Sequence, residues 1–301
     1  RRKLSIGHSL HNRAIRTLLQ REEAKRFSLG TRLPNIYLGI PLPHTVEKRR
    51  LRAWFANLGW NTALSRTIYS MALRNLSTWT VPDGMAKSMQ NAGGAAEFDL
   101  VYGWDYAGPI LDHVKTSNRL GLVEVYKLAL ADPSACSIIR AKRPDDKAIV
   151  GTVVLYTQQS RLAEFVPAMR SLAGEMACGI SSPVISPSVA DYATLLQGLI
   201  LLGVKQMKRQ GNNTSVLDYV SSITYTHPRD NPLTKCLQMD GDGNVDGLKA
   251  MGFEVLHDFE EVSVDSTSFS MVQPSAYGEG ASYLGRGAAV EKDFLAQPPT
   301  T

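Results

Sequence analysis

Hydrophobic residues near the start of the chain recur every three or four positions. They form one stripe made of Leu10, Ala14, Ile15, Leu18 and Leu19. This spacing predicts an amphipathic helix with one apolar face. Residues 35–40 and 68–73 are short apolar runs that are typical of strands. Between them, residues 45–58 carry a second helical pattern with Thr45 as its N-cap.

Strand and helix patterns continue to alternate after residue 97, with one further apolar segment at 121–130. We predict strands over 98–102, 136–142, 148–156, 179–185, 214–219 and 253–259, and helices over 105–114, 162–176, 189–208 and 246–251. The second and third of these strands are close enough to form a hairpin. Such an alternation predicts an α/β fold.

Two lobes are predicted. Leu58, Gly59 and Trp60 end a helical pattern before a strand, and Met251, Gly252 and Phe253 do the same near the other end of the chain. This echo indicates a weak internal repeat. The segment 80–94 is rich in Gly, Ala and Ser, which is typical of a linker. We therefore predict a first lobe over 1–78, a linker over 79–96, a second lobe over 97–262 and an irregular tail over 263–301.

A short basic turn with a glycine leads directly into the first helix. The unpaired N–H groups and the dipole at a helix N-terminus favour an anion. Gly7 lets a phosphate approach the backbone, and the basic residues Arg1, Arg2 and Lys3 add positive charge. The predicted anion-binding residues are Arg2, Lys3, Leu4, Ser5, Ile6, Gly7 and His8.

Positive charge is concentrated in the first part of the chain. Residues 1–90 contain 16 Lys and Arg against 4 Asp and Glu, whereas the whole chain has a net charge of +5. A basic region suits a phosphorylated cofactor or a nucleic acid. The chain carries no nucleic-acid-binding motif, and its aromatic residues are not interleaved with the basic ones. We therefore expect a phosphorylated cofactor and no nucleic-acid partner.

Several other classes are disfavoured. The three cysteines, Cys136, Cys178 and Cys236, are odd in number and widely spaced, which favours a reducing compartment and a cytoplasmic location. Residues 240–246 resemble a calcium loop, but Val245 and Met251 stand where the loop needs Gly and Glu, so no metal is predicted. The sequence has no run of eighteen apolar residues, and we expect no membrane span.

The basic turn and its helix resemble the acetyl-CoA pyrophosphate loop of the GNAT superfamily of N-acetyltransferases. In the family pattern, Gln/Arg-x-x-Gly-x-Gly/Ala, Arg2 takes the first place, Ser5 replaces the first Gly and Gly7 keeps the second. The resemblance implies a mixed sheet flanked by helices, acetyl-CoA as the cofactor, and transfer to an amine. It also implies that the first lobe is incomplete, since its early strands would precede Arg1.

The second lobe departs from this pattern. Its corresponding turn has Ala190, Ala193 and Leu195 at the key places, and Asp191 would repel a diphosphate. We therefore expect only the first lobe to bind the cofactor.

The first lobe also departs from the family pattern at the catalytic acid. The tyrosine that serves many family members as the acid is replaced by Phe55 in the first lobe and by Leu248 in the second. The remaining catalytic candidates are Tyr37 and Asp105. Asp105 lies among three aromatic residues in segment 102–106, which is either a wall for a sugar acceptor or a corner of core aromatics with Asp105 as an N-cap.

Longer stretches resemble the C-terminal region of fungal proteins that begin with a family 3 β-N-acetylglucosaminidase domain. These stretches are residues 2–20, 51–66, 98–115, 181–189 and 195–203. The resemblance implies a small amine as the acceptor, in particular an amino sugar such as glucosamine, and a glycosidase domain linked in the parent chain. The alternative is a non-catalytic accessory region of that glycosidase.

Overall fold

The structure of the 301-residue chain is a computed structural model. It describes residues 6–20, 25–30, 39–41, 46–62, 66–83, 85, 90–91, 94, 96–164, 176–213, 222–228 and 247–266. The predicted strand at 214–219 lies outside these residues, as does most of the predicted strand at 35–40 and most of the predicted helix at 162–176.

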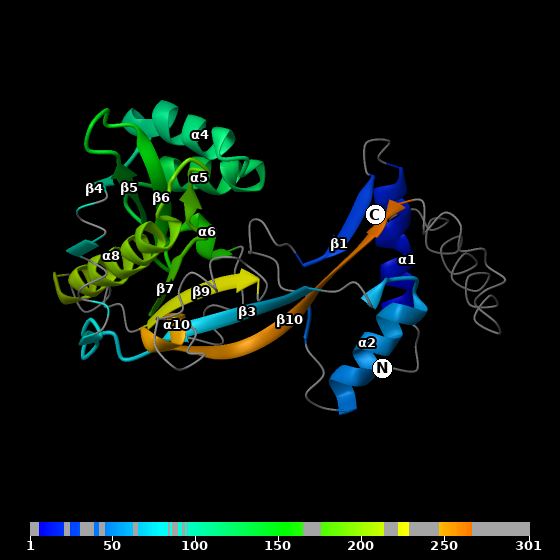
Figure 1. Cartoon of the computed structure of the whole chain (residues 1–301). Helices are drawn as coiled ribbons and strands as arrows, with labels where there is room; N and C mark the ends of the chain where they lie inside the picture. Colours follow the sequence, from blue (N-terminus) through cyan, green and yellow to red (C-terminus); the bar gives the residue numbers. More distant parts are fainter. Residues whose placement is uncertain are drawn as a thin grey trace, which may run out of the picture. The chain divides into compact units, whose positions relative to one another are not determined.

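Helices and strands alternate along the chain, as the sequence predicts (Figure 1). The α-helices are α1 (Ile6–Leu19), α2 (Val46–Asn57), α4 (Ala107–Thr116), α5 (Val123–Ala131), α6 (Arg161–Glu164), α8 (Tyr192–Asn213) and α10 (Gly247–Ala250), and the 3-10 helices are η3 (Trp104–Tyr106) and η4 (Leu120–Leu122). The strands are β1 (Arg26–Leu29), β2 (Ile40–Pro41), β3 (Arg66–Leu73), β4 (Glu97–Val101), β5 (Cys136–Lys142), β6 (Ile149–Tyr156), β7 (Ala177–Ile180), β8 (Val184–Ile185), β9 (Ser222–Pro228) and β10 (Phe253–Asp265).

The chain divides into two compact units, which are described separately. The smaller unit contains residues 1–28, 49–65 and 262–301, and the larger unit contains residues 29–48 and 66–261. Each unit is built from segments far apart in the sequence. The predicted lobe limits stay predictions, because compact units follow contacts and need not follow the limits of sequence repeats.

The larger unit is built on a mixed sheet. Its strands are ordered β10-β3-β9-β7-β6-β5-β4, with β2 paired to β10 and β8 paired to β6. The pair β7–β9 is parallel and the other pairs are antiparallel. Strand β3, from early in the chain, lies between β9 and β10, so that Met71 faces Tyr225 on one side and Val255 on the other. The predicted α/β class with a mixed sheet is therefore confirmed.

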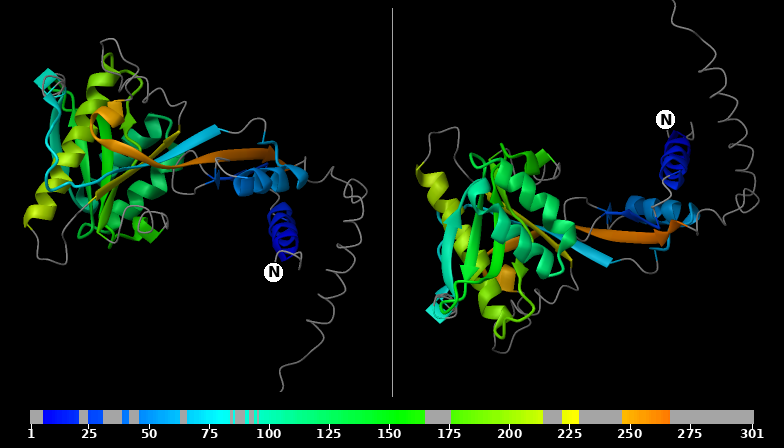
Figure 2. Two further views of the ribbon diagram at one scale, coloured as in Figure 1. Left: turned by 90° about the horizontal axis from the view of Figure 1, so that it is seen from below. Right: turned by 90° about the horizontal axis from the view of Figure 1, so that it is seen from above.

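Helices cover both faces of this sheet (Figures 1 and 2). On β6, Val153 and Leu155 belong to the buried cluster that contains α8, whereas Val154 and Tyr156 belong to the cluster that contains α4 and α5. Successive side chains of a strand point to opposite faces. A strand buried on both faces favours apolar residues at successive positions, and between Ile149 and Tyr156 the one polar side chain is Thr152.

The smaller unit combines α1, most of α2, the start of β1 and the end of β10. The Ser266 N–H donates to the Lys25 carbonyl over 2.9 Å, and the Arg26 guanidinium donates to the Ser263 hydroxyl. Strand β10 thus continues to Asp265, which lies within the predicted irregular tail, because β1 supplies a pairing partner.

Helix α1 is confirmed, but its apolar stripe is largely uncovered in the described part of the chain. Ile15 is buried, whereas Leu10 is 64% exposed and both Leu18 and Leu19 are also exposed. The amphipathic pattern thus predicts the helix correctly, whereas it does not predict which positions are buried.

The repeated Gly-aromatic ending has one backbone conformation in both places. Gly59 and Gly252 adopt left-handed φ angles of 93° and 94°. Their N–H groups donate to the Ala56 and Lys249 carbonyls over 3.0 and 2.9 Å. A left-handed residue commonly ends a helix, and glycine adopts that conformation without strain. The two endings are therefore the same kind of helix cap.

Candidate functional site

The predicted anion site coincides with the start of α1. Ile6, Gly7 and His8 form the first turn of this helix, while Arg2, Lys3, Leu4 and Ser5 lie outside the described residues. The first turn contains no acidic residue. The four N-terminal N–H groups of an α-helix have no partner within the helix. The start of α1 therefore has the polarity that an anion requires.

Gly7 is not required there by packing or by backbone conformation. A Cβ at Gly7 would lie 3.5 Å from Trp54 Cζ2, which is an ordinary contact distance. The φ angle of Gly7 is not in the left-handed region. The absence of a side chain at Gly7 leaves its backbone accessible from the helix N-terminus.

Two indole–imidazole hydrogen bonds fasten α2 to α1 in the smaller unit. Trp54 Nε1 donates to His8 Nδ1 over 3.4 Å, and Trp60 Nε1 donates to His11 Nε2 over 2.8 Å. The His8 and Trp54 rings meet edge to face, with centroids 5.3 Å apart. A protonated imidazole cannot accept a hydrogen bond. The bond from Trp60 therefore requires a neutral His11.

The electrostatic setting of His11 agrees with this requirement. Burial lowers the pKa of His11, and the nearby charge of His8 lowers it further, although a hydrogen bond to Asn12 acts in the opposite direction. The neutral ring is therefore favoured in the folded smaller unit. Sequence reasoning assigned no role to His11, and its helical spacing of three from His8 was the available signal.

The corresponding helix start in the larger unit is closed to anions. At the start of α8, the Thr194 N–H donates to Asp191 Oδ1 over 3.0 Å, and the Leu195 N–H donates to the Asp191 carbonyl over 3.3 Å. Asp191 is thus the N-cap, and its carboxylate already complements the helix dipole. A phosphate placed there would meet a negative charge.

The strand before α8 bends away from its parallel neighbour. Strand β7 pairs with β9 from Ala177–Ser222 to Ile180–Tyr225. The predicted strand at 179–185 is then interrupted: Ser181 Oγ accepts a hydrogen bond from the Val154 N–H over 3.0 Å, and β8 resumes pairing with β6 alone. Within the described residues, β7–β8 and β9 therefore part after Ile180.

A buried polar contact lies beneath this bend. The Tyr126 hydroxyl is 2.8 Å from Thr152 Oγ1, and both side chains are buried. Burial raises the pKa of Tyr126, although hydrogen bonds from Thr152 and Ser181 oppose that effect. This phenol is therefore a structural group and does not release a proton. It was missed in the sequence because it lies within the apolar segment 121–130.

The two predicted catalytic candidates have different outcomes. Tyr37 lies outside the described residues. Asp105 is exposed in η3, and the N-cap of α4 is Tyr106. The neighbouring Tyr102 and Trp104 are exposed as well, so the interpretation of segment 102–106 as a core corner capped by Asp105 is wrong. Phe55 lies in α2 and Leu248 lies in α10, and neither side chain can donate a proton as a catalytic acid.

His113 has a structural role. This residue belongs to α4 and its side chain is buried, with Nε2 3.3 Å from the Val184 carbonyl. Burial lowers the pKa of His113, although backbone hydrogen bonds to Val184 and Ile149 oppose this effect.

No metal centre is found among the described residues, because they contain no group of three or more His, Cys, Asp or Glu side chains able to hold an ion. The calcium-like segment 240–246 lies outside them.

None of the described helices is both long enough and apolar enough to cross a bilayer.

Comparison with known proteins gives likenesses in fold alone. No protein-family model and no curated protein matches the chain. A tandem GNAT protein from the clavulanic acid biosynthesis pathway aligns with 88% of this chain and 71% of its own, at 14% identity and a TM-score of 0.47. A GCN5-related N-acetyltransferase from Sphaerobacter thermophilus aligns with 87% of this chain and 69% of its own, at 14% identity and a TM-score of 0.47. A GCN5-related N-acetyltransferase from Anabaena variabilis aligns with 84% of this chain and 49% of its own, at 9% identity and a TM-score of 0.41.

Proposed function

We propose that the chain is part of an acetyl-CoA-dependent N-acetyltransferase that acts on a small amine. The proposal rests on the contrast between two helix starts. Helix α1 follows a basic segment of the sequence and has no acid in its first turn, whereas α8 is capped by the carboxylate of Asp191. The first arrangement favours a diphosphate and the second opposes it.

Residues at the start of α1 fit the diphosphate of this cofactor. Arg2 and Lys3 supply positive charge, and the N–H groups of the turn and of the first helical residues supply donors. Gly7 has no side chain that would obstruct the approach of a phosphate oxygen to these donors. His8 is exposed beside them, and its Nδ1 accepts a hydrogen bond from the Trp54 indole. When bound, acetyl-CoA supplies the activated acetyl thioester.

The acceptor in this proposal is an amino sugar such as glucosamine. It is supported by the resemblance to fungal proteins that carry a family 3 β-N-acetylglucosaminidase domain, which also implies a linked glycosidase domain. The proposed cytoplasmic location rests on the three widely spaced cysteines, and the expectation of no nucleic-acid or membrane partner rests on the motifs and hydropathy of the sequence. The acceptor ammonium must lose a proton before it reacts, and the departing thiol must gain one. Tyr37 and Asp105 remain the candidates for these steps.

A non-catalytic accessory region is the second candidate function. It is favoured by Phe55 and Leu248, which replace the expected tyrosine acid, and by the Asp191 cap that closes the start of α8. This alternative predicts that no amine is acetylated, whether or not acetyl-CoA binds.

Calorimetric titration of acetyl-CoA and CoA into the chain tests the cofactor proposal. We expect Arg2→Glu to weaken binding at least about tenfold, because a charged hydrogen bond contributes about 1.5–3 kcal/mol. Arg16→Glu is the matched control, since Arg16 lies in the last turn of the same helix and its reversal changes the net charge equally. Equal losses in both variants, or no binding by the unmodified chain, would refute the proposal. Acetylation of glucosamine then separates the two candidate functions.

A further inference from the structure

Three aromatic side chains are exposed within five residues of the larger unit. They lie where β4 leads into α4, and their exposed fractions are 43% for Tyr102, 53% for Trp104 and 41% for Tyr106. Single exposed aromatics are common on protein surfaces, but clustered ones mark binding sites. These side chains, with Asp105 between them, are called the aromatic platform below.

The backbone between the first two aromatic residues has a conformation that only glycine adopts readily. Gly103 has φ 70° and ψ −176°. A Cβ there would approach only Pro133, at 3.9 Å, so the requirement for glycine is conformational and not steric. Gly103 turns the chain so that Trp104 begins η3 and does not continue β4.

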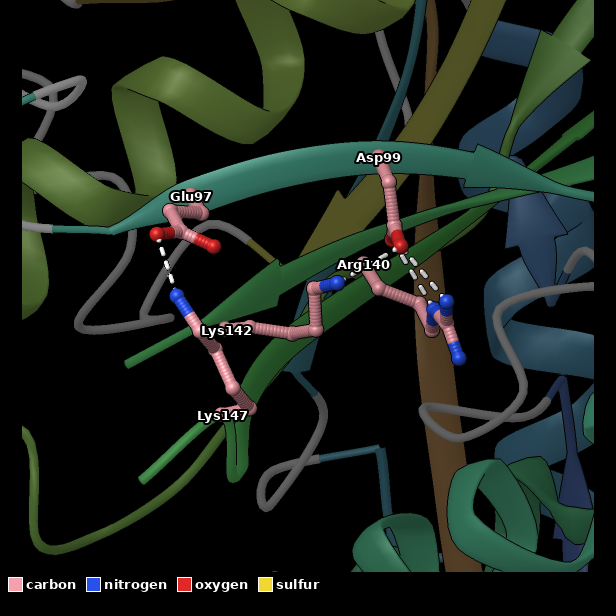
Figure 3. A network of polar contacts seen from close by, with 5 residues as sticks. All are labelled: Glu97, Asp99, Arg140, Lys142 and Lys147. Atoms are coloured by element: carbon pink, nitrogen blue, oxygen red, sulfur yellow. Dashed lines mark hydrogen bonds and ion pairs between the residues drawn. The ribbon is translucent and has the colours of Figure 1, made fainter. Parts of the chain in front are cut away.

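The ring of Tyr106 is held from one side by a fixed cation. Arg140 lies over this ring, with its guanidinium carbon 4.7 Å from the ring centroid. Asp99 fixes the guanidinium through bonds of 2.9 Å to Nε and 2.5 Å to Nη2, and Lys142 lies 3.0 Å from the same carboxylate (Figure 3). In Figure 3 the third guanidinium nitrogen points away from Asp99.

The protonation state of Asp99 supports this arrangement. Burial acts to raise the pKa of Asp99, but hydrogen bonds from Arg140 and Lys142 outweigh burial and lower it. The carboxylate therefore stays charged and holds Arg140 in place. A ring that is already ordered loses little conformational entropy when a ligand stacks on its free face.

Asp105 offers an available carboxylate beside these rings. It is exposed, and among the described residues it makes no hydrogen bond and no ion pair through its side chain. The neighbouring carboxylates Glu97 and Asp99 are by contrast paired with Lys147, Arg140 and Lys142. Among the described residues, the carboxylate of Asp105 is thus available to a cationic or hydroxyl-bearing ligand.

We propose that Tyr102, Trp104, Asp105 and Tyr106 form a binding platform for a saccharide of amino-sugar units. The negative face of an aromatic ring attracts the C–H face of a sugar ring, and a carboxylate pairs with the sugar ammonium. A cage for a small quaternary ammonium would instead gather its rings around one cation. No two of these three fully described rings are in contact, which fits an extended ligand. The choice of an amino sugar rests on the proposed function, whereas the location of the platform does not.

Binding without acetyl-CoA tests this inference separately from the cofactor proposal. The probes are a tetrasaccharide of glucosamine and a tetrasaccharide of N-acetylglucosamine, titrated into the full chain by calorimetry. We expect both to bind, and we expect Trp104→Ala to weaken binding about tenfold through loss of stacking. Leu120→Ala is the matched control, because Leu120 is another exposed apolar side chain of the larger unit, 66% exposed, and lies outside the platform.

Substitution of the carboxylate adds a second readout. Asp105→Asn keeps the size of the side chain and removes its charge, so it should weaken binding of the glucosamine tetrasaccharide more than binding of the N-acetylated one. Three results would overturn the inference: no saccharide binding by the unmodified chain, equal losses in Trp104→Ala and Leu120→Ala, or binding of choline in preference to both saccharides. All variants alter exposed residues, and their far-ultraviolet circular dichroism should match that of the parent.

Discussion

Substituting Gly7 by alanine separates a structural role of this glycine from a role in cofactor binding. The methyl group would meet Trp54 Cζ2 at 3.5 Å, so the space exists and no neighbour has to move. The backbone of Gly7 is not left-handed, so alanine fits its conformation as well. On structural grounds alone, the substitution is therefore harmless.

The two roles predict changes of opposite sign. Alanine is favoured over glycine by about 1 kcal/mol inside a helix, and a gain of about 0.5 kcal/mol in the free energy of unfolding is reasonable in a first turn. The Cα–Cβ bond of a helical residue tilts toward the helix N-terminus, so the new methyl group enters the space assigned to the phosphate. Because a phosphate oxygen must come within about 2.9 Å of a backbone nitrogen, CoA affinity should fall at least about tenfold.

Gly108 provides a matched control. It is the second residue of α4, as Gly7 is of α1, and a Cβ there would meet nothing within 4 Å. Urea denaturation should show similar small gains in stability for Gly7→Ala and Gly108→Ala, while calorimetry should show a loss of CoA affinity for Gly7→Ala alone. Unchanged affinity in Gly7→Ala would refute the idea that a phosphate approaches the backbone at this residue.

Three further predictions concern stability. Because the pKa of His11 is lowered, the folded chain binds fewer protons than the unfolded chain below pH 6.5. Stability should therefore fall as the pH drops from about 7 toward the folded-state pKa. His11→Gln should remove that part of the pH dependence in thermal melts, while Trp60 keeps a hydrogen-bond acceptor. Tyr126→Phe should cost about 1–3 kcal/mol in urea denaturation, because Thr152 loses its partner, and adding Thr152→Val should recover part of that loss. Asp191→Ala should cost about 1 kcal/mol as a lost N-cap and leave CoA affinity unchanged, whereas reduced affinity would place the cofactor at α8 instead.

Local patterns predict most of the elements and little of their pairing. The hairpin of β5 and β6 and the helices α1, α2 and α8 are all visible in the periodicity, because each is set by residues close in sequence. The position of β3 between β9 and β10 is not visible, since it joins segments separated by well over a hundred residues. Strand β9 was not predicted either, as Ser222–Pro228 is rich in polar residues and its pairing depends on β3.

The helix starts of the candidate site could be predicted from the local sequence, whereas the exposure of its side chains could not. The basic residues before an amphipathic stripe predict a helix in this region, and α1 begins at Ile6, inside the segment predicted as a turn. Asp191 is recognisable as an acid at the other helix start. The exposure of Tyr102, Trp104 and Tyr106 could not be read from the sequence, because the same residues would suit a buried corner. What distinguishes the two cases is the distant Arg140, which lies over one ring from the neighbouring strand β5.

The two helix starts and the two helix ends indicate how the two predicted lobes differ. Gly59 and Gly252 keep the same left-handed cap with φ angles one degree apart, and the aromatic residue after each of them is buried. Backbone geometry of this kind tolerates few substitutions, since other residues are strained there. Charge at a helix start is freer to change: a single carboxylate at Asp191 suffices to reverse the preference for an anion. We therefore expect two similar helix ends and two helix starts of opposite charge preference if one predicted lobe binds the cofactor and the other supports it.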